Sequence, residues 1–217
     1  MWFAARLAAI VVLGTGGMAM ADDAAFFAAA VSDDGAAITA QLADGQDIEA
    51  RDADGRTALL LATRADAQHA ATALVAAGAD VNAKDSIQDT PYLYAGAEGR
   101  TAILALLLAH GANLTDTNRF GGTALIPAAE KGHPDNVRLL LKAGVDPDHI
   151  NSLGWTALLE AIVLTDGGPV HQEIVSLLIE GGADVNIADG AGLSPLSLAR
   201  QRGFREIVAM LEAAGAQ

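Results

Sequence analysis

The stretch of this chain best suited to carry chemistry is LTDGGPVHQ, residues 164–172. It places Asp166, a Gly-Gly turn and His171 close in sequence to Glu160. A carboxylate beside a histidine can transfer protons if both groups converge on one concave site. These residues define one hypothesis, a small hydrolase or ligand-binding pocket that uses Glu160 with the segment 164–172.

Other features of the sequence weigh against an enzyme. No nucleophile stands beside a base, and the glycine pair lacks the lysine and the preceding strand of a phosphate-binding loop. The five histidines include no pair four residues apart, and the absence of cysteine removes thiolate zinc sites. We therefore expect no catalytic residue, metal site or cofactor. Under this alternative, residues 164–172 are an insertion in a surface loop, where added length costs little.

Composition limits both the core and the partners. Hydrophobic residues make up 52% of the 217 residues but aromatic residues only 4%, so small Ala and Leu contacts must build the core. The chain has 13 Lys and Arg against 27 Asp and Glu, a net charge of −14. That charge repels nucleic-acid phosphates and anionic membrane surfaces, and it argues against a nucleic-acid partner.

The first 21 residues have the layout of a secretory signal peptide. One positive charge, Arg6, precedes an apolar run from Leu7 to Leu13, and small residues follow up to Ala19-Met20-Ala21. The alternative is an uncleaved anchor, but the apolar run falls short of the roughly 18 to 20 residues that cross a bilayer. We expect cleavage after Ala21, a periplasmic location and no stable membrane anchor after cleavage.

Two series of landmarks reveal an internal repeat. Threonines open similar stretches every 33 residues, at Thr57, Thr90, Thr123 and Thr156. Glycines keep the same spacing, step once by 38 residues and then return to 33, at Gly45, Gly78, Gly111, Gly144, Gly182 and Gly215. Both series predict a fixed structural unit, with five extra residues between the two helices of one unit.

Each unit carries the signals of two helices and a projecting turn. A Thr or Ser before Pro or Ala predicts a helix N-cap, with Pro91 and Pro195 in the first turn. Runs such as NVRLLLKAG predict a second helix that ends at glycine. Polar stretches such as GADVNAKD predict the turn between units.

These stretches resemble ankyrin repeats. The pattern D-x-x-G-x-T-P-L-H-x-A…L-L-x-x-G-A-D-V-N is approached by NRFGGTALIPAAEKGHPDNVRLLLKAGVDPD and by NSLGWTALLEA…EIVSLLIEGGADVN. The resemblance implies an all-α solenoid of stacked helix-turn-helix units with projecting β-turn fingers. Six units are expected, the first a degenerate cap: 22–51, 52–84, 85–117, 118–150, 151–188 and 189–217.

The sequence also departs from the ankyrin pattern. Apolar residues or serine replace the histidine of the T-P-L-H motif, so apolar packing must take over the contacts of that histidine. Gln88 stands where the other units have a turn glycine, and Pro127 lies one turn into its helix.

The resemblance implies a protein partner bound by the turn tips and the exposed face of the first helices. Aromatic and arginine side chains cluster there in the central units, as they do in protein-interface hot spots. The alternative for Phe120 and Trp155 is that they brace adjacent turns. The expected contact residues are Ile87, Tyr94, Arg119, Phe120, Glu130, Lys131, Leu153, Trp155, Glu160 and Leu193, on a surface that also includes Arg64, Asp89 and Glu98.

The expected function is therefore protein recognition by an exported monomer without chemistry of its own. Exported bacterial members of the family suggest a role in envelope or oxidative-stress physiology, and this context comes from the resemblance alone. Two other hypotheses stay open: the pocket around Glu160, and a stability or inhibitor module whose partner binds the acidic outer surface.

Overall fold

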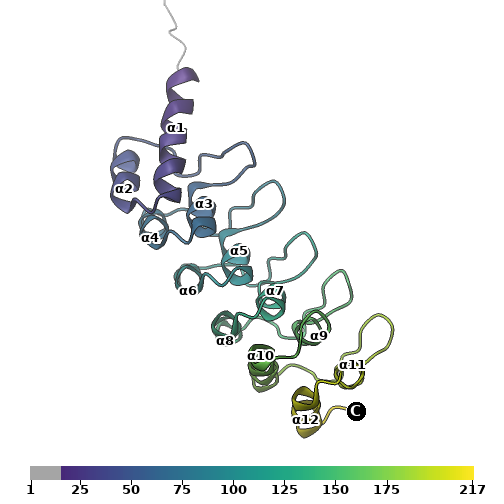
Figure 1. Cartoon of the computed structure of the whole chain (residues 1–217). Coiled ribbons are helices and arrows are strands. Elements are labelled where there is room, and N and C mark those ends of the chain that lie inside the picture. The colour runs from purple at the N-terminus through teal and green to yellow at the C-terminus, as the bar shows by residue number, and fades with distance from the viewer. Residues whose placement is uncertain (1–15) are drawn as a thin grey trace, which may run out of the picture.

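The computed structural model describes residues 16–217, which form twelve helices in six consecutive pairs (Figure 1). Residues 1–15 of the predicted signal peptide lie outside the described residues. The helices are α1 (Gly16–Val31), α2 (Gly35–Ala43), α3 (Ala58–Ala65), α4 (Gln68–Ala76), α5 (Pro91–Ala97), α6 (Thr101–Ala109), α7 (Leu125–Glu130), α8 (Pro134–Ala143), α9 (Ala157–Val163), α10 (Pro169–Glu180), α11 (Pro195–Arg202) and α12 (Arg205–Ala213).

The pairs stack into a solenoid. First helices form one row, second helices form another, and long turns project beyond the first helices on one side (Figure 1). Within residues 16–217 the backbone forms no strand, and its β-pairing is the isolated bridge between Arg51 and Thr57. The expected all-α solenoid is confirmed.

A row of alanines lets the first helices approach one another. These alanines are fully buried and recur with the period of the repeat, at Ala62, Ala95, Ala128, Ala161 and Ala199. Because alanine adds one methyl group to the backbone, neighbouring helices can pack at the short end of the usual 8–10 Å range. At Gly96 the approach is closer still, since a Cβ there would lie 2.7 Å from the Cβ of Ala124.

The second helices contribute leucines at one repeated position, all fully buried: Leu74, Leu107, Leu140, Leu178 and Leu211. A polar exception, Asn136, is also fully buried. Its Nδ2 donates to the carbonyls of Ala95 and Gly96 at 2.9 and 3.0 Å, and its Oδ1 accepts from Thr101 Oγ1 at 2.8 Å. Asn136 therefore satisfies the end of α5, whose last carbonyls have no partner within the helix.

The repeated threonines are helix N-caps, as the sequence predicts. Thr57, Thr90 and Thr156 each accept a hydrogen bond on Oγ1 from the backbone N–H three residues later. Each cap carbonyl also accepts from the N–H four residues later, for example that of Glu160 in the case of Thr156. Both bonds satisfy groups that a helix start would leave unpaired.

Thr123 is the exception, and Pro127 explains it. Pro127 occupies the position that donates to the cap carbonyl in the other units, and proline has no N–H. The N–H of Ile126 donates to the Thr123 carbonyl instead, at 3.3 Å. Thr123 Oγ1 is consequently buried without a hydrogen-bond partner, and α7 begins at Leu125.

This difference predicts unequal costs for the same substitution. Thr156→Val should lower the free energy of unfolding by about 1 kcal/mol, because the Leu159 N–H loses its cap. Thr123→Val should leave stability unchanged or raise it, since the hydroxyl that it removes is buried and unpaired. Urea unfolding of the two variants measures the difference, and equal losses would contradict the account.

The glycine landmarks end the second helices in left-handed backbone. Gly45, Gly78, Gly111, Gly144, Gly182 and Gly215 have φ between 85° and 95°, and no atom would meet a Cβ there. Backbone conformation alone, not space, therefore selects glycine. Gln88, which replaces a turn glycine, keeps the left-handed conformation with φ 70°.

The described helices include none that is long and apolar enough to span a bilayer. Helix α1 passes through the predicted cleavage site, so cleavage after Ala21 would remove the first residues of this helix.

Candidate functional site: a groove across the central repeats

A groove of about 510 Å³ crosses the second to fifth repeats. Its walls come from the projecting turns on one side and from the first helices on the other. The lining residues are Arg64, Ile87, Asp89, Leu93, Tyr94, Ala97, Glu98, Asn118, Arg119, Phe120, Gly122, Ile126, Pro127, Glu130, Lys131, Asn151, Leu153, Glu160 and Leu164.

Eight of the ten expected contact residues line this groove: Ile87, Tyr94, Arg119, Phe120, Glu130, Lys131, Leu153 and Glu160. Trp155 and Leu193 are half-buried and lie outside its lining. Trp155 donates its backbone N–H to Asn151 within its own turn. The aromatic cluster in the groove therefore consists of Tyr94 and Phe120.

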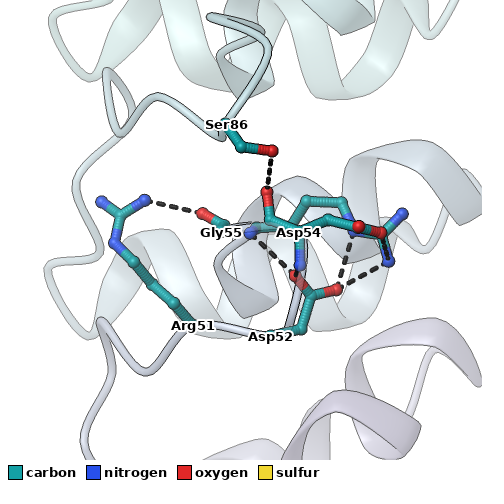
Figure 2. Close-up of polar contacts among 6 residues, drawn as sticks. Arg51, Asp52, Asp54, Gly55 and Ser86 are labelled. Carbon is teal, nitrogen blue, oxygen red and sulfur yellow. Dashed lines mark hydrogen bonds and ion pairs between the residues drawn. The ribbon is translucent and has the colours of Figure 1, made fainter.

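The projecting turns are rigid because one side chain in each accepts two backbone N–H groups. Figure 2 shows the turn of the second repeat, where Asp52 Oδ1 accepts from the N–H groups of Asp54 and Arg56 at 2.9 Å. Ser86 of the next turn donates through Oγ to the Asp54 carbonyl at 2.6 Å. The turns are thus fixed internally and also linked to each other.

The turn tips present a row of exposed apolar side chains. Ile87, Phe120 and Leu153 occupy the same position in three consecutive repeats and are 47, 53 and 60% exposed. Apolar side chains held in solvent by hydrogen-bonded turns are typical of a contact surface. Asp54 and Ala191 take this position in the flanking repeats, so the row is confined to the central ones.

Two arginines lie over the aromatic rings of the groove. The Arg64 guanidinium is 4.6 Å from the Tyr94 ring centre, and that of Arg119 is 4.7 Å from the Phe120 ring centre. Both distances suit a cation–π contact. Each arginine thereby holds its ring in one orientation in the groove.

Glu160 lies at the floor of the groove, and here the sequence-based expectation of an exposed residue is wrong. Its side chain is only 5% exposed because α9 packs between α7 and α11. Glu160 Oε1 accepts from Asn151 Nδ2 at 2.7 Å. Burial, and secondly the charge of Glu130, raise the pKa of Glu160 to about 7.

The Asn151–Glu160 bond connects the floor to a turn tip. Asn151 Oδ1 accepts the backbone N–H groups of Leu153 and Trp155, at 2.9 and 3.1 Å. An asparagine, unlike the aspartate of other repeats, also has an amide group to donate, and Glu160 accepts it. Sequence analysis missed Asn151 as a groove residue, although asparagine at this position together with Glu160 was a usable signal.

The inserted segment is shorter than expected from the sequence. The expected loop reaches residue 172, but α10 begins at Pro169, so only residues 164–168 form the loop and His171 lies in the first helical turn. The insertion has also lengthened the helix, because α10 has 12 residues whereas α8 has 10.

The inserted loop packs against the last repeat. Arg202 of α11 donates to the Thr165 carbonyl at 2.8 Å. Gly167 has φ 67°, and a Cβ there would lie 2.6 Å from the ring of Phe204. Only glycine fits both conditions, so the loop and the last repeat are closely matched.

The residues of the hydrolase hypothesis do not line one site. Asp166 Oδ1 lies 3.7 Å from His171 Nδ1, and His171 Nε2 lies 3.0 Å from the Glu130 carbonyl oxygen. Neither Asp166 nor His171 lines the groove that contains Glu160. His171 instead interacts with the last carbonyl of α7, and the geometry does not favour catalysis.

Other polar features of the described residues do not form a second site. No three His, Cys, Asp or Glu side chains between residues 16 and 217 gather as metal ligands would. A hollow of about 690 Å³ lies at the first repeat, but its lining has no exposed aromatic or cationic side chain: Asp23, Gln41, Asp44, Gly45, Gln46, Asp47 and Ala50.

Comparisons with known proteins identify the family. The family model for ankyrin repeats (3 copies) matches residues 25–118 and 112–189, so the chain belongs to the ankyrin repeat family. The chain is 58% identical over 57 residues to YahD of Escherichia coli K12, a curated protein named as an ankyrin repeat protein. That match spans 26% of the chain and 28% of the relative.

Two solved structures are similar over most of the chain. An ankyrin repeat domain from Acinetobacter baumannii AYE has 56% identity and a TM-score of 0.86, covering 88% of this chain and 98% of that domain. The ankyrin repeat protein EF0377 has 46% identity and a TM-score of 0.83, covering 87% and 96%. Ankyrin repeats are in general protein-interaction modules, and this coarse function applies to the chain.

The raised pKa of Glu160 predicts how stability depends on pH. The folded protein holds this proton more tightly than the unfolded chain, so the free energy of unfolding falls as pH rises from 4.5 to about 7. Glu160→Gln keeps an acceptor for Asn151 and removes the charge. The variant should be about 2 kcal/mol more stable than the parent at pH 8 and equal to it at pH 4.

Urea unfolding at both pH values measures this effect. Glu206→Gln, an exposed residue of α12, is the matched control and should change neither value. If Glu160→Gln gave the same difference in stability at both pH values, the account of its buried carboxylate would be wrong.

Proposed function

We propose that this chain binds a partner protein through the groove of its second to fifth repeats and does no chemistry itself. The observation that carries the proposal is the row of exposed apolar tips, Ile87, Phe120 and Leu153, beside aromatic rings held by arginines. Such a surface gains by leaving water. The chain acts as a monomer in this proposal, because a net charge of −14 opposes self-association.

Rigidity supports recognition of a partner without large rearrangement. The turn tips are fixed by paired hydrogen bonds to Asp85, Asn118 and Asn151. Turns that are ordered before binding lose little conformational entropy when they bind. The groove can therefore convert its apolar contacts into affinity.

Substitution of the tips tests the proposal. Phe120→Ala and Leu153→Ala should each weaken binding to a partner captured with the full chain by about 30-fold, the effect of truncating an interface hot spot. Val31→Ala is the matched control, since Val31 is 52% exposed but lies on α1. Titration with the purified partner measures the affinities. Unchanged affinity in both groove variants would place binding elsewhere, for example on the acidic outer surface.

We further propose export to the periplasm, in envelope or oxidative-stress physiology. The support is the pattern of residues 1–21, with Arg6, an apolar run and Ala19-Met20-Ala21. The protein recovered from a periplasmic fraction should begin at Asp22 by N-terminal sequencing. Recovery only from the cytoplasm, with residues 1–21 still attached, would refute export.

A further inference from the structure

The charges of the groove indicate the chemistry of its partner. We propose that the groove binds a segment of the partner in which a Lys or Arg side chain lies between apolar residues, with the cation placed against the carboxylates of Glu130 and Glu160. The inference rests on the proposed function, because it specifies the partner of the same groove.

Most charges in the groove already have a counterpart. Arg119 Nη1 lies 4.0 Å from Asp89 Oδ2, and Lys131 pairs with Glu98. Arg64 lies over the Tyr94 ring, and its charge also acts on Asp89, where it opposes the increase in pKa caused by burial. The cationic side chains at the second and third repeats are therefore engaged.

The two carboxylates at the fourth and fifth repeats differ from the others. Within residues 16–217 neither Glu130 nor Glu160 forms an ion pair, and the hydrogen-bond donor found for the Glu160 carboxylate is the neutral amide of Asn151. The charge of Glu130 acts on Glu160 and helps to raise its pKa. A cation between these carboxylates would remove that repulsion.

Neighbouring positive groups do not fill this role. On α7, Lys131 follows Glu130 but pairs with Glu98. On α11, Arg202 donates to the Thr165 carbonyl, and on α10, His171 interacts with the Glu130 backbone carbonyl. The carboxylates thus remain available to a cation supplied by the partner.

The surroundings of the carboxylates are apolar. Phe120 and Leu153 flank them from the turns, and Leu164 closes the groove at the end of α9. Adjacent repeats are spaced by the 8–10 Å of packed helices, which an extended chain spans in about three residues. A segment of roughly six or seven residues therefore reaches from Ile87 to Leu153, with its cation among apolar side chains.

Long-range electrostatics favour the same partner. The net charge of −14 attracts basic segments and repels acidic ones before contact. Local pairing and overall charge therefore agree, and an acidic segment would meet repulsion from both.

A random 12-residue peptide display library, selected on the full chain, tests the inference. Peptides whose binding is lost in Phe120→Ala identify ligands of the groove. These peptides should be enriched in Lys or Arg beside apolar residues. Labelled copies should bind the Glu130→Gln/Glu160→Gln double variant at least about tenfold more weakly, and the control Glu206→Gln with unchanged affinity. The double variant should fold, because it removes a buried charge.

Each other outcome has a defined meaning. Groove peptides that are acidic or uncharged, or that bind the double variant as tightly as the parent, overturn the inference and leave the proposed function standing. If every selected peptide binds equally to Phe120→Ala, the proposed function itself fails, and the inference fails with it.

Discussion

The close contact of first helices along the alanine row is the constraint on which the structure depends. A single helix pair cannot bury its apolar face, so each pair needs its neighbours. Ala62, Ala95, Ala128, Ala161 and Ala199 are fully buried and set how closely the pairs stack. That spacing in turn places the turn tips side by side, and the apolar tips of three repeats thereby become one surface.

Function in this account comes from departures within a regular scaffold. Exposed apolar residues at the turn tips, and a glutamate at the floor where other repeats have Leu, Tyr or Pro, distinguish the central repeats. The Asn151–Glu160 hydrogen bond joins both features, since the residue that shapes a tip is held by the residue at the floor. A charge is tolerated there because the groove leaves Glu160 in contact with solvent.

The repeat, the caps and the glycine helix ends could be predicted from sequence because they are local. Thr156 caps its helix through atoms three residues away, and Gly144 is selected by its own φ. The burial of Glu160 and the packing of Gly167 on Phe204 depend on neighbouring repeats, so spacing alone could not reveal them. The unpaired hydroxyl of Thr123 lies between these cases, because Pro127 signals it once the cap geometry is known.

The central claim, that the groove is the contact surface, is tested most directly by hydrogen–deuterium exchange of the full chain with and without a purified partner. The account predicts slower exchange on binding in the three central turns, residues 85–90, 118–123 and 151–156. The second helices α6, α8 and α10 should exchange at the same rate in both states. Slower exchange confined to those second helices, with the turns unchanged, would contradict the account.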